Sequence, residues 1–178
     1  MTFATDTSSP VLFIIFNRPE TTAQVFESIR QARPKRLYVA ADGPRPERDT
    51  DQSLCRQTRA VIDQVDWDCQ VLRLFRTENL GCKYAVSSAI SWFFEHEPEG
   101  IILEDDCVAH GSFFRFCDEL LDFHRNNEQV MAVCGANFQK GLWHPSESYY
   151  FWLFSRIFDY TLVPASFQVY DKRPLAGT

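Results

Sequence analysis

The stretch Val11-Leu-Phe-Ile-Ile-Phe16 is an unbroken apolar run of strand length, and Asn17-Arg18-Pro19 follows it directly. From Thr21 to Gln31, apolar side chains then recur at helical spacing, and Pro34 ends that segment. The chain is therefore predicted to open with a strand followed by a helix.

The same alternation continues along the chain. Further strands are predicted at Leu37–Ala41, Cys69–Arg76, Gly100–Leu103 and Gln129–Cys134. Helices are predicted from Thr50, a plausible N-cap, to Val65, around the apolar series Cys82, Val86, Ala89 and Phe93, and from Phe113 to Leu121. Strands that alternate with helices indicate βαβ units, and thus an α/β fold with a mostly parallel, Rossmann-like sheet flanked by helices.

The C-terminal part lacks this pattern. Aromatic residues crowd the stretch from Tyr149 to Tyr170 without a clear period, and the segment from Asp171 onward is predicted to be a frayed tail. We therefore expect a folded domain over residues 1–151 and an irregular aromatic tail over residues 152–178.

Composition narrows the class of protein. A length of 178 residues suits one domain, and 24 acidic residues against 18 Lys and Arg give a net charge of −6, which argues against a nucleic-acid binder. No apolar run is long enough to span a bilayer, and the segment Met1–Pro10 lacks the basic start of a signal peptide. We expect a cytoplasmic protein, including the cytoplasmic face of the membrane, with no transmembrane segment.

Six cysteines are spread along the chain without a CxxC pair, and none stands at zinc-ligand spacing from a histidine. We interpret them as small, mostly buried thiols rather than a disulfide or metal framework.

Polar residues follow three of the predicted strands, where an open α/β sheet binds its ligands. Asn17 and Arg18 follow the first strand, Asp42 the second, and Glu104-Asp105-Asp106 the fourth. Carboxylate oxygens suit Mg²⁺ or Mn²⁺, which commonly bind one or two carboxylates plus substrate phosphates. The triplet could also be a solvated loop, but its position directly after a buried strand favours a functional site.

The single candidates each have two interpretations. Arg18 either meets a phosphate or caps a surface, and Asp42 either binds a base or ribose or only forms a turn with Gly43. Lys83, near a helix start, is either a point charge for a diphosphate or a solvated lysine. Arg18 and Asp42 are both expected to be exposed.

The histidines lack a nucleophile partner, and the sequence contains no GxSxG or Walker-type loop. They are interpreted as surface or core residues. His110, close after the triplet, is kept as a candidate neighbour of a metal or diphosphate.

Taken in order, these segments resemble the nucleotide-binding half of GT-A glycosyltransferases, in particular the haemolytic-protein-A-like sugar transferases. This family is related to the N-acetylglucosaminyltransferases whose metal motif is Glu-Asp-Asp. The resemblance covers about residues 10–151 and is carried by Pro10–Pro19, Ala41-Asp-Gly43, Glu78-Asn-Leu-Gly81, Ile102–Asp106 and Phe113-Phe114.

The resemblance implies a metal-dependent transfer of a sugar from a nucleotide-diphospho-sugar, UDP-linked, to a hydroxyl of a glycan or other acceptor. Mn²⁺ or Mg²⁺ would be held by Asp106, and Glu104 and Asp105 would face the ribose and the transferred sugar. The nucleotide would be framed by Phe16, Asn17, Arg18 and Asp42.

The chain departs from this family after Tyr150, where a Trp-rich segment and an acceptor-binding half would follow. On that basis we expect the acceptor half to be truncated and no catalytic base to be assignable, with apolar surface covered by the tail or in a homodimer. The alternative is a truncated or degenerate relative that binds a nucleotide-sugar without significant transfer. A nucleotidyltransferase is disfavoured because the first strand leads to Asn-Arg-Pro and not to a Gly-rich loop.

Overall fold

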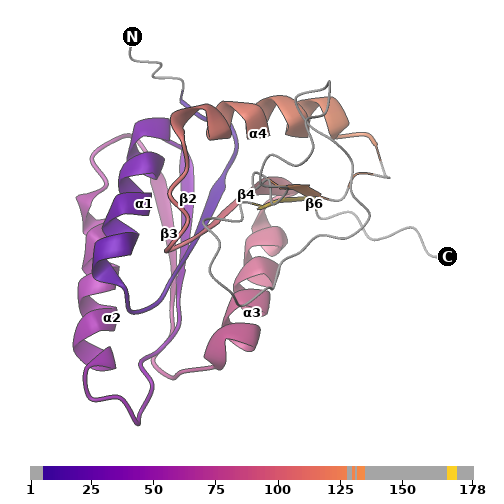
Figure 1. The fold of residues 1–178 in the computed structure, drawn as a ribbon. Helices are drawn as coiled ribbons and strands as arrows, with labels where there is room; N and C mark the ends of the chain where they lie inside the picture. Colours follow the sequence, from indigo (N-terminus) through magenta and orange to yellow (C-terminus); the bar gives the residue numbers. More distant parts are fainter. Residues whose placement is uncertain (1–5, 128–129, 131, 135–167, 172–178) are drawn as a thin grey trace, which may run out of the picture.

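The structure is a computed structural model, and it describes residues 6–127, 130, 132–134 and 168–171. Strands and helices alternate along the chain (Figure 1). The strands are β1 (Val11–Ile15), β2 (Arg36–Ala41), β3 (Gln70–Phe75), β4 (Glu99–Glu104), β5 (Ala132–Cys134) and β6 (Gln168–Asp171). The helices are α1 (Pro19–Ala32), α2 (Asp51–Ala60), α3 (Gly81–His96) and α4 (Gly111–His124), with a 3₁₀ turn η1 (Val61–Gln64) after α2.

The strands form one sheet in the order β3-β2-β1-β4-β6-β5. The first four are mutually parallel, whereas β6 runs antiparallel to both of its neighbours. The α/β class and the mostly parallel, Rossmann-like sheet predicted from the sequence are confirmed. The chain builds outward from β1 to β2 and β3, and then returns to place β4 on the other side of β1.

Hydrophobic cores cover β1 on both faces, which explains why its sequence is apolar without alternation. Val11, Phe13 and Ile15 belong to a core shared with α1, η1 and α4, whereas Leu12 belongs to a second core shared with α3. Figure 1 accordingly shows α1 and α2 on one side of the sheet and α3 on the other. The central strand is thus packed against side chains on both faces.

The helix boundaries differ from the sequence predictions in two places. Helix α1 begins at Pro19, ahead of the expected Thr21, because proline fits the first turn of a helix, where its missing N–H is not needed. The helix expected to reach Val65 ends at Ala60 and tightens into η1. Thr50 does stand at the N-cap, but its side chain makes no capping hydrogen bond.

The irregular tail expected over residues 152–178 contains strand β6, which lies between β4 and β5 in the sheet. The strand expected over Gln129–Cys134 is described as the shorter β5. The rest of the aromatic segment, the domain boundary at residue 151 and the expected truncation lie outside the described residues.

Two further features concern the cysteines and the lengths of the helices. None of the five cysteines whose side chains the structure describes forms a disulfide, and Cys55, Cys107 and Cys117 are buried. In the described part of the chain, no helix has the length and apolar character needed to cross a membrane.

Candidate functional site

The candidate site lies where the carboxyl ends of β1 and β4 meet, at the point where the strand order reverses. Ile14 pairs with Glu104 across these two strands, so the loop that starts at Phe16 lies beside the loop that starts at Asp105. Ligands of open α/β sheets bind in the crevice at such a reversal. The fold therefore brings together two segments that are 88 residues apart, as measured between Arg18 and Asp106.

Arg18 joins the two loops by ion pairs. Its Nη1 donates to Oδ2 of Asp106 at 2.6 Å and lies 3.5 Å from Oδ1 of Asp105. The side chains of Arg18 and Asp106 are 52% and 48% exposed, whereas Asp105 is buried. The buried carboxylate also accepts the backbone N–H of Phe16 at 3.1 Å. Asp105 thus holds the loops together, and the Arg18–Asp106 pair stands at the surface.

Burial and mutual repulsion disfavour the charged form of the carboxyl groups at this site. Burial raises the pKa of Asp105 to about 6, although Arg18 and the amide of Phe16 act in the opposite direction. Burial, together with the charges of Asp106 and Asp105, also raises the pKa of half-buried Glu104. Burial alone would lower the pKa of Arg18, but the neighbouring carboxylates outweigh it and raise that pKa. Three carboxylates therefore surround one guanidinium, which leaves excess negative charge.

A hard divalent cation could bind these carboxylates only together with oxygens from a ligand or from water. Within the described residues, no three Asp, Glu, His or Cys side chains converge as a ready-made metal cage. Mg²⁺ and similar ions do not need one, since they bind through one or two carboxylates and complete their shell with phosphate oxygens and water. Asp106 has the most exposed carboxylate of the three, and the metal role that the family resemblance implies for it stays a prediction.

A second cluster, which sequence reasoning missed, lies beside the first. Asp51 is only 2% exposed, and its carboxylate accepts hydrogen bonds from Asn17 Nδ2 at 2.8 Å and from Arg45 Nε at 2.6 Å. The Arg45 guanidinium also lies 5.3 Å from the centre of the Phe16 ring. In the sequence Asp51 follows Thr50 at the start of a helix, where acidic residues are common. Its role in joining Asn17 and Arg45 is therefore visible only in the structure. The cluster fixes Phe16 and Asn17 from the side of α2.

Asp42 is not at an exposed strand end as expected, because only 8% of it is accessible. Its carboxylate accepts backbone N–H groups from Gly43 at 3.0 Å, Leu80 at 3.0 Å and Gly81 at 3.1 Å. It therefore forms the turn with Gly43 that the sequence allowed, and it also satisfies amides at the start of α3. A contact between Asp42 and a nucleotide remains a prediction.

Gly43 lies against the segment that precedes α3. Its N–H donates to the carbonyl of Glu78 at 3.2 Å, and Asn79 Nδ2 donates to the carbonyl of Gly43 at 2.7 Å. A Cβ on Gly43 would overlap the backbone of Glu78. The Asp-Gly and Glu-Asn-Leu-Gly segments singled out in the sequence are therefore one packed unit.

Lys83 and His110 are placed less specifically. Lys83 is exposed on α3, and its Nζ lies 5.5 Å from the centre of the Tyr84 ring. His110 is the N-cap of α4, where its Nδ1 accepts the N–H of Ser112 at 3.3 Å. Helix capping accounts for His110 in this structure, and contacts of either residue with a diphosphate remain predictions.

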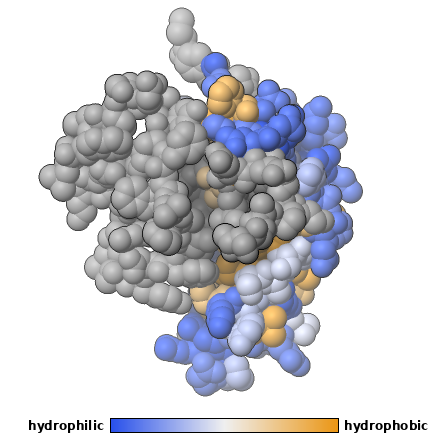
Figure 2. Space-filling view, turned by 90° about the vertical axis from the view of Figure 1, so that its right-hand side faces the viewer, coloured by the Kyte–Doolittle hydropathy of each residue, from blue (hydrophilic) through white to orange (hydrophobic). Residues whose placement is uncertain are grey.

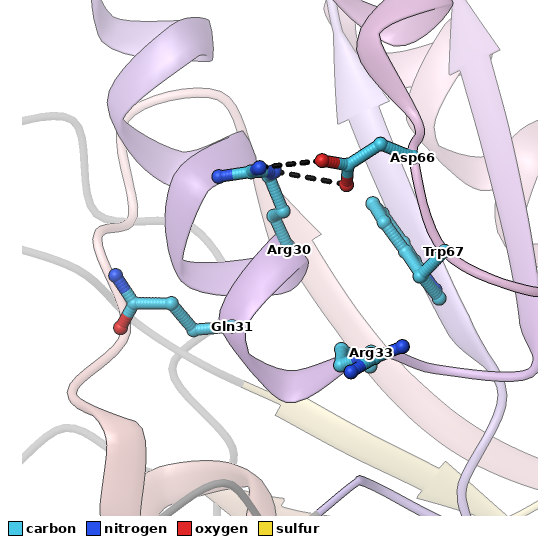
Figure 3. A pocket seen from close by; sticks show the side chains of 5 residues that line it. All are labelled: Arg30, Gln31, Arg33, Asp66 and Trp67. Atoms are coloured by element: carbon cyan, nitrogen blue, oxygen red, sulfur yellow. Dashed lines mark hydrogen bonds and ion pairs between the residues drawn. The ribbon is translucent and has the colours of Figure 1, made fainter. Parts of the chain in front are cut away.

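A pocket near the amino-terminal ends of the strands differs from the candidate site (Figure 3). It is lined by Arg30, Gln31, Arg33, Asp66 and Trp67. Arg30 Nε donates to Asp66 at 2.9 Å, and the indole N–H of Trp67 donates to the carbonyl of Pro34 at 2.8 Å. Because these polar groups are already hydrogen-bonded, we interpret this pocket as structural.

On the face shown in Figure 2, the described surface is mostly hydrophilic, with scattered hydrophobic residues.

A scan of the sequence against protein-family models gives no match, and a search of curated proteins finds no similar sequence.

Proposed function

We propose that this protein is a metal-dependent glycosyltransferase. It binds a nucleotide-diphospho-sugar, UDP-linked, with Mn²⁺ or Mg²⁺ between the carboxyl ends of β1 and β4, and transfers the sugar to a hydroxyl of a glycan or another acceptor. One observation carries the proposal: the Phe16–Arg18 and Glu104–Asp106 segments meet at the reversal of the strand order. The resemblance of both segments to GT-A enzymes supplies the reaction class.

The proposed diphosphate site has two sources of positive charge. The guanidinium of Arg18 can bind phosphate oxygens in a bidentate manner, which makes the hydrogen bonds both strong and directional. Helix α1 begins at the next residue, Pro19, so the positive end of its dipole faces the same region. On the other side of Arg18, Phe16 and Asn17 are held by the Asp51 cluster and would frame the nucleoside.

The carboxylates have separate parts in this proposal. Asp106 would hold the cation, which neutralises charge on the leaving diphosphate when it is bound. Glu104 and Asp105 would face the ribose and the transferred sugar, in keeping with the family resemblance. Asp105 also fixes the loop after β1 through the amide of Phe16.

Calorimetric titration with UDP, with and without Mn²⁺, tests the proposal. The wild-type protein should bind UDP more tightly with Mn²⁺, and Asp106→Asn should weaken that metal-dependent binding at least about tenfold, or about 1.4 kcal/mol. Asp122→Asn is the matched control, because Asp122 on α4 is also exposed and is paired with an arginine, Arg125. Unchanged affinity in Asp106→Asn would remove the metal role of this residue.

A panel of nucleotide-sugars in the same assay, followed by a search for transfer products, tests the reaction. Donor binding without transfer to any offered acceptor would favour the binding-only alternative.

A further inference from the structure

Arg18 occupies one of the two carboxylate oxygens of Asp106, Oδ2, whereas the other oxygen, Oδ1, accepts the thiol of Cys107 at 3.5 Å. In the structure Arg18 Nη1 lies 2.6 Å from Asp106 Oδ2, a full charge-assisted hydrogen bond. An Mg²⁺ ion bound to that oxygen would lie about 2.0–2.1 Å from it. Two positive groups cannot share one oxygen at these distances without strong repulsion. The ion pair therefore competes with a cation that binds at Oδ2.

The same guanidinium is well placed to leave Asp106 when a phosphate arrives. Arg18 is half exposed, and in the described part of the chain both of its ion pairs use one nitrogen, Nη1. It stands at the N-cap of α1 without a side-chain capping bond, so nothing described ties its side chain to the helix. A diphosphate offers the guanidinium a bidentate partner, and the move would free the Asp106 oxygen.

We propose that Arg18 is a tethered counter-cation that keeps a lone divalent cation off Asp106 until a diphosphate draws it away. The proposal rests on the proposed function, because UDP and Mn²⁺ are its two ligands. Nucleotide and cation binding are coupled as a result. The coupling is reciprocal, since each ligand must raise the affinity for the other by the same factor.

Arg18→Ala separates this inference from ordinary phosphate binding, because the expected effects have opposite signs. Loss of the guanidinium should weaken binding of UDP alone, yet it should tighten binding of Mn²⁺ alone about fivefold, the low end of typical coupling between sites. Arg18→Lys retains the positive charge and should leave binding of Mn²⁺ alone weak.

Arg125→Ala is the matched control. Arg125 is 53% exposed and paired with Glu99 and Asp122, much as Arg18 is 52% exposed and paired with two aspartates. Its removal changes the net charge equally but should leave Mn²⁺ binding unchanged. Combining Arg18→Ala with Asp106→Asn should abolish the gain, because the double-mutant cycle assigns it to that carboxylate.

The experiment measures free Mn²⁺ by its electron paramagnetic resonance signal during titration of each variant, with and without UDP. Tighter binding of Mn²⁺ alone in Arg18→Ala, with a smaller enhancement by UDP, supports the inference. Unchanged or weaker Mn²⁺ binding in Arg18→Ala overturns it, while metal-dependent UDP binding in the wild type would leave the proposed function standing. No binding of Mn²⁺ or UDP to any variant overturns both.

Discussion

Gly43 is fixed as glycine by the backbone of Glu78, because a Cβ at this position would overlap that backbone. Backbone atoms yield less readily than the end of a flexible side chain. Gly43→Ala should therefore destabilise the protein by about 1–3 kcal/mol, the usual range for overpacking. Urea unfolding measures this change as a lower midpoint with an unchanged slope.

Gly111→Ala is the control for that prediction. Gly111 begins α4, and a Cβ there meets no atom within 4 Å. Alanine should be neutral or stabilising by up to about 1 kcal/mol, because it reduces the freedom of the unfolded chain. Equal stability of the two variants would show that the contact between Gly43 and Glu78 is not tight.

Asp42 shows why single residues are hard to assign from sequence. Its position after a strand is correctly predicted, but its carboxylate accepts the backbone N–H of Leu80, 38 residues further along the chain. Local patterns report spacing along one segment and contain no information on such a partner. The turn with Gly43 is local, and the sequence does indicate it as one of two alternatives.

At the scale of elements, Asp51 links the loops after β1 and β2 to the start of α2. Hydrogen bonds from Arg45, and a smaller contribution from Asn17, lower the pKa of Asp51 to about 2 against the effect of burial. An unfolded aspartate titrates near about 3.9. Because the folded pKa is the lower one, the stabilisation is complete above about pH 4 and is lost as the pH falls towards about 2.

Asp51→Asn should therefore lower stability at neutral pH by about 1–3 kcal/mol, the effect of removing a partner from a buried polar group. It should also flatten the decline in stability between about pH 4 and about pH 2. Urea unfolding over this pH range measures both effects. Asp63→Asn is the control, since Asp63 is exposed and its ion pair in the described part of the chain is with exposed Arg73. A decline as steep in Asp51→Asn as in the wild type would contradict the assignment.

The elements from β1 to α4 could be predicted because each has a local signature. An apolar run such as Val11–Phe16 indicates a strand, and apolar residues at helical spacing indicate a helix. Strand β6 could not be predicted, since Gln168–Asp171 has only four residues and is a strand through its pairing with β4 and β5. The sequence likewise predicts that polar residues gather at the carboxyl ends, but the Asp51 cluster depends on contacts between loops.

At the scale of the whole molecule, the strand order decides which loops share a ligand. Because β4 lies beside β1 and not beside β3, the loop after β4 meets the first loop of the chain. The pocket between Arg30 and Trp67 lies near the amino-terminal ends of the strands of the same sheet. A single binding experiment can therefore show whether a ligand binds at the carboxyl ends of the strands or at their amino-terminal ends.

Hydrogen exchange in the presence of UDP and Mn²⁺ should locate the ligand site. A ligand at about 100 times its Kd stabilises the native state by about 2.7 kcal/mol, which slows every amide that exchanges by global unfolding. Amides that exchange by local opening report the site itself. We expect slower local exchange in residues 16–18 and 105–107, and no change near Arg33 and Trp67. Asp106→Asn should remove the local protection. Protection confined to the pocket of Figure 3 would instead place the binding site at the amino-terminal ends of the strands. The Arg30–Asp66 ion pair would then have to open to admit the ligand.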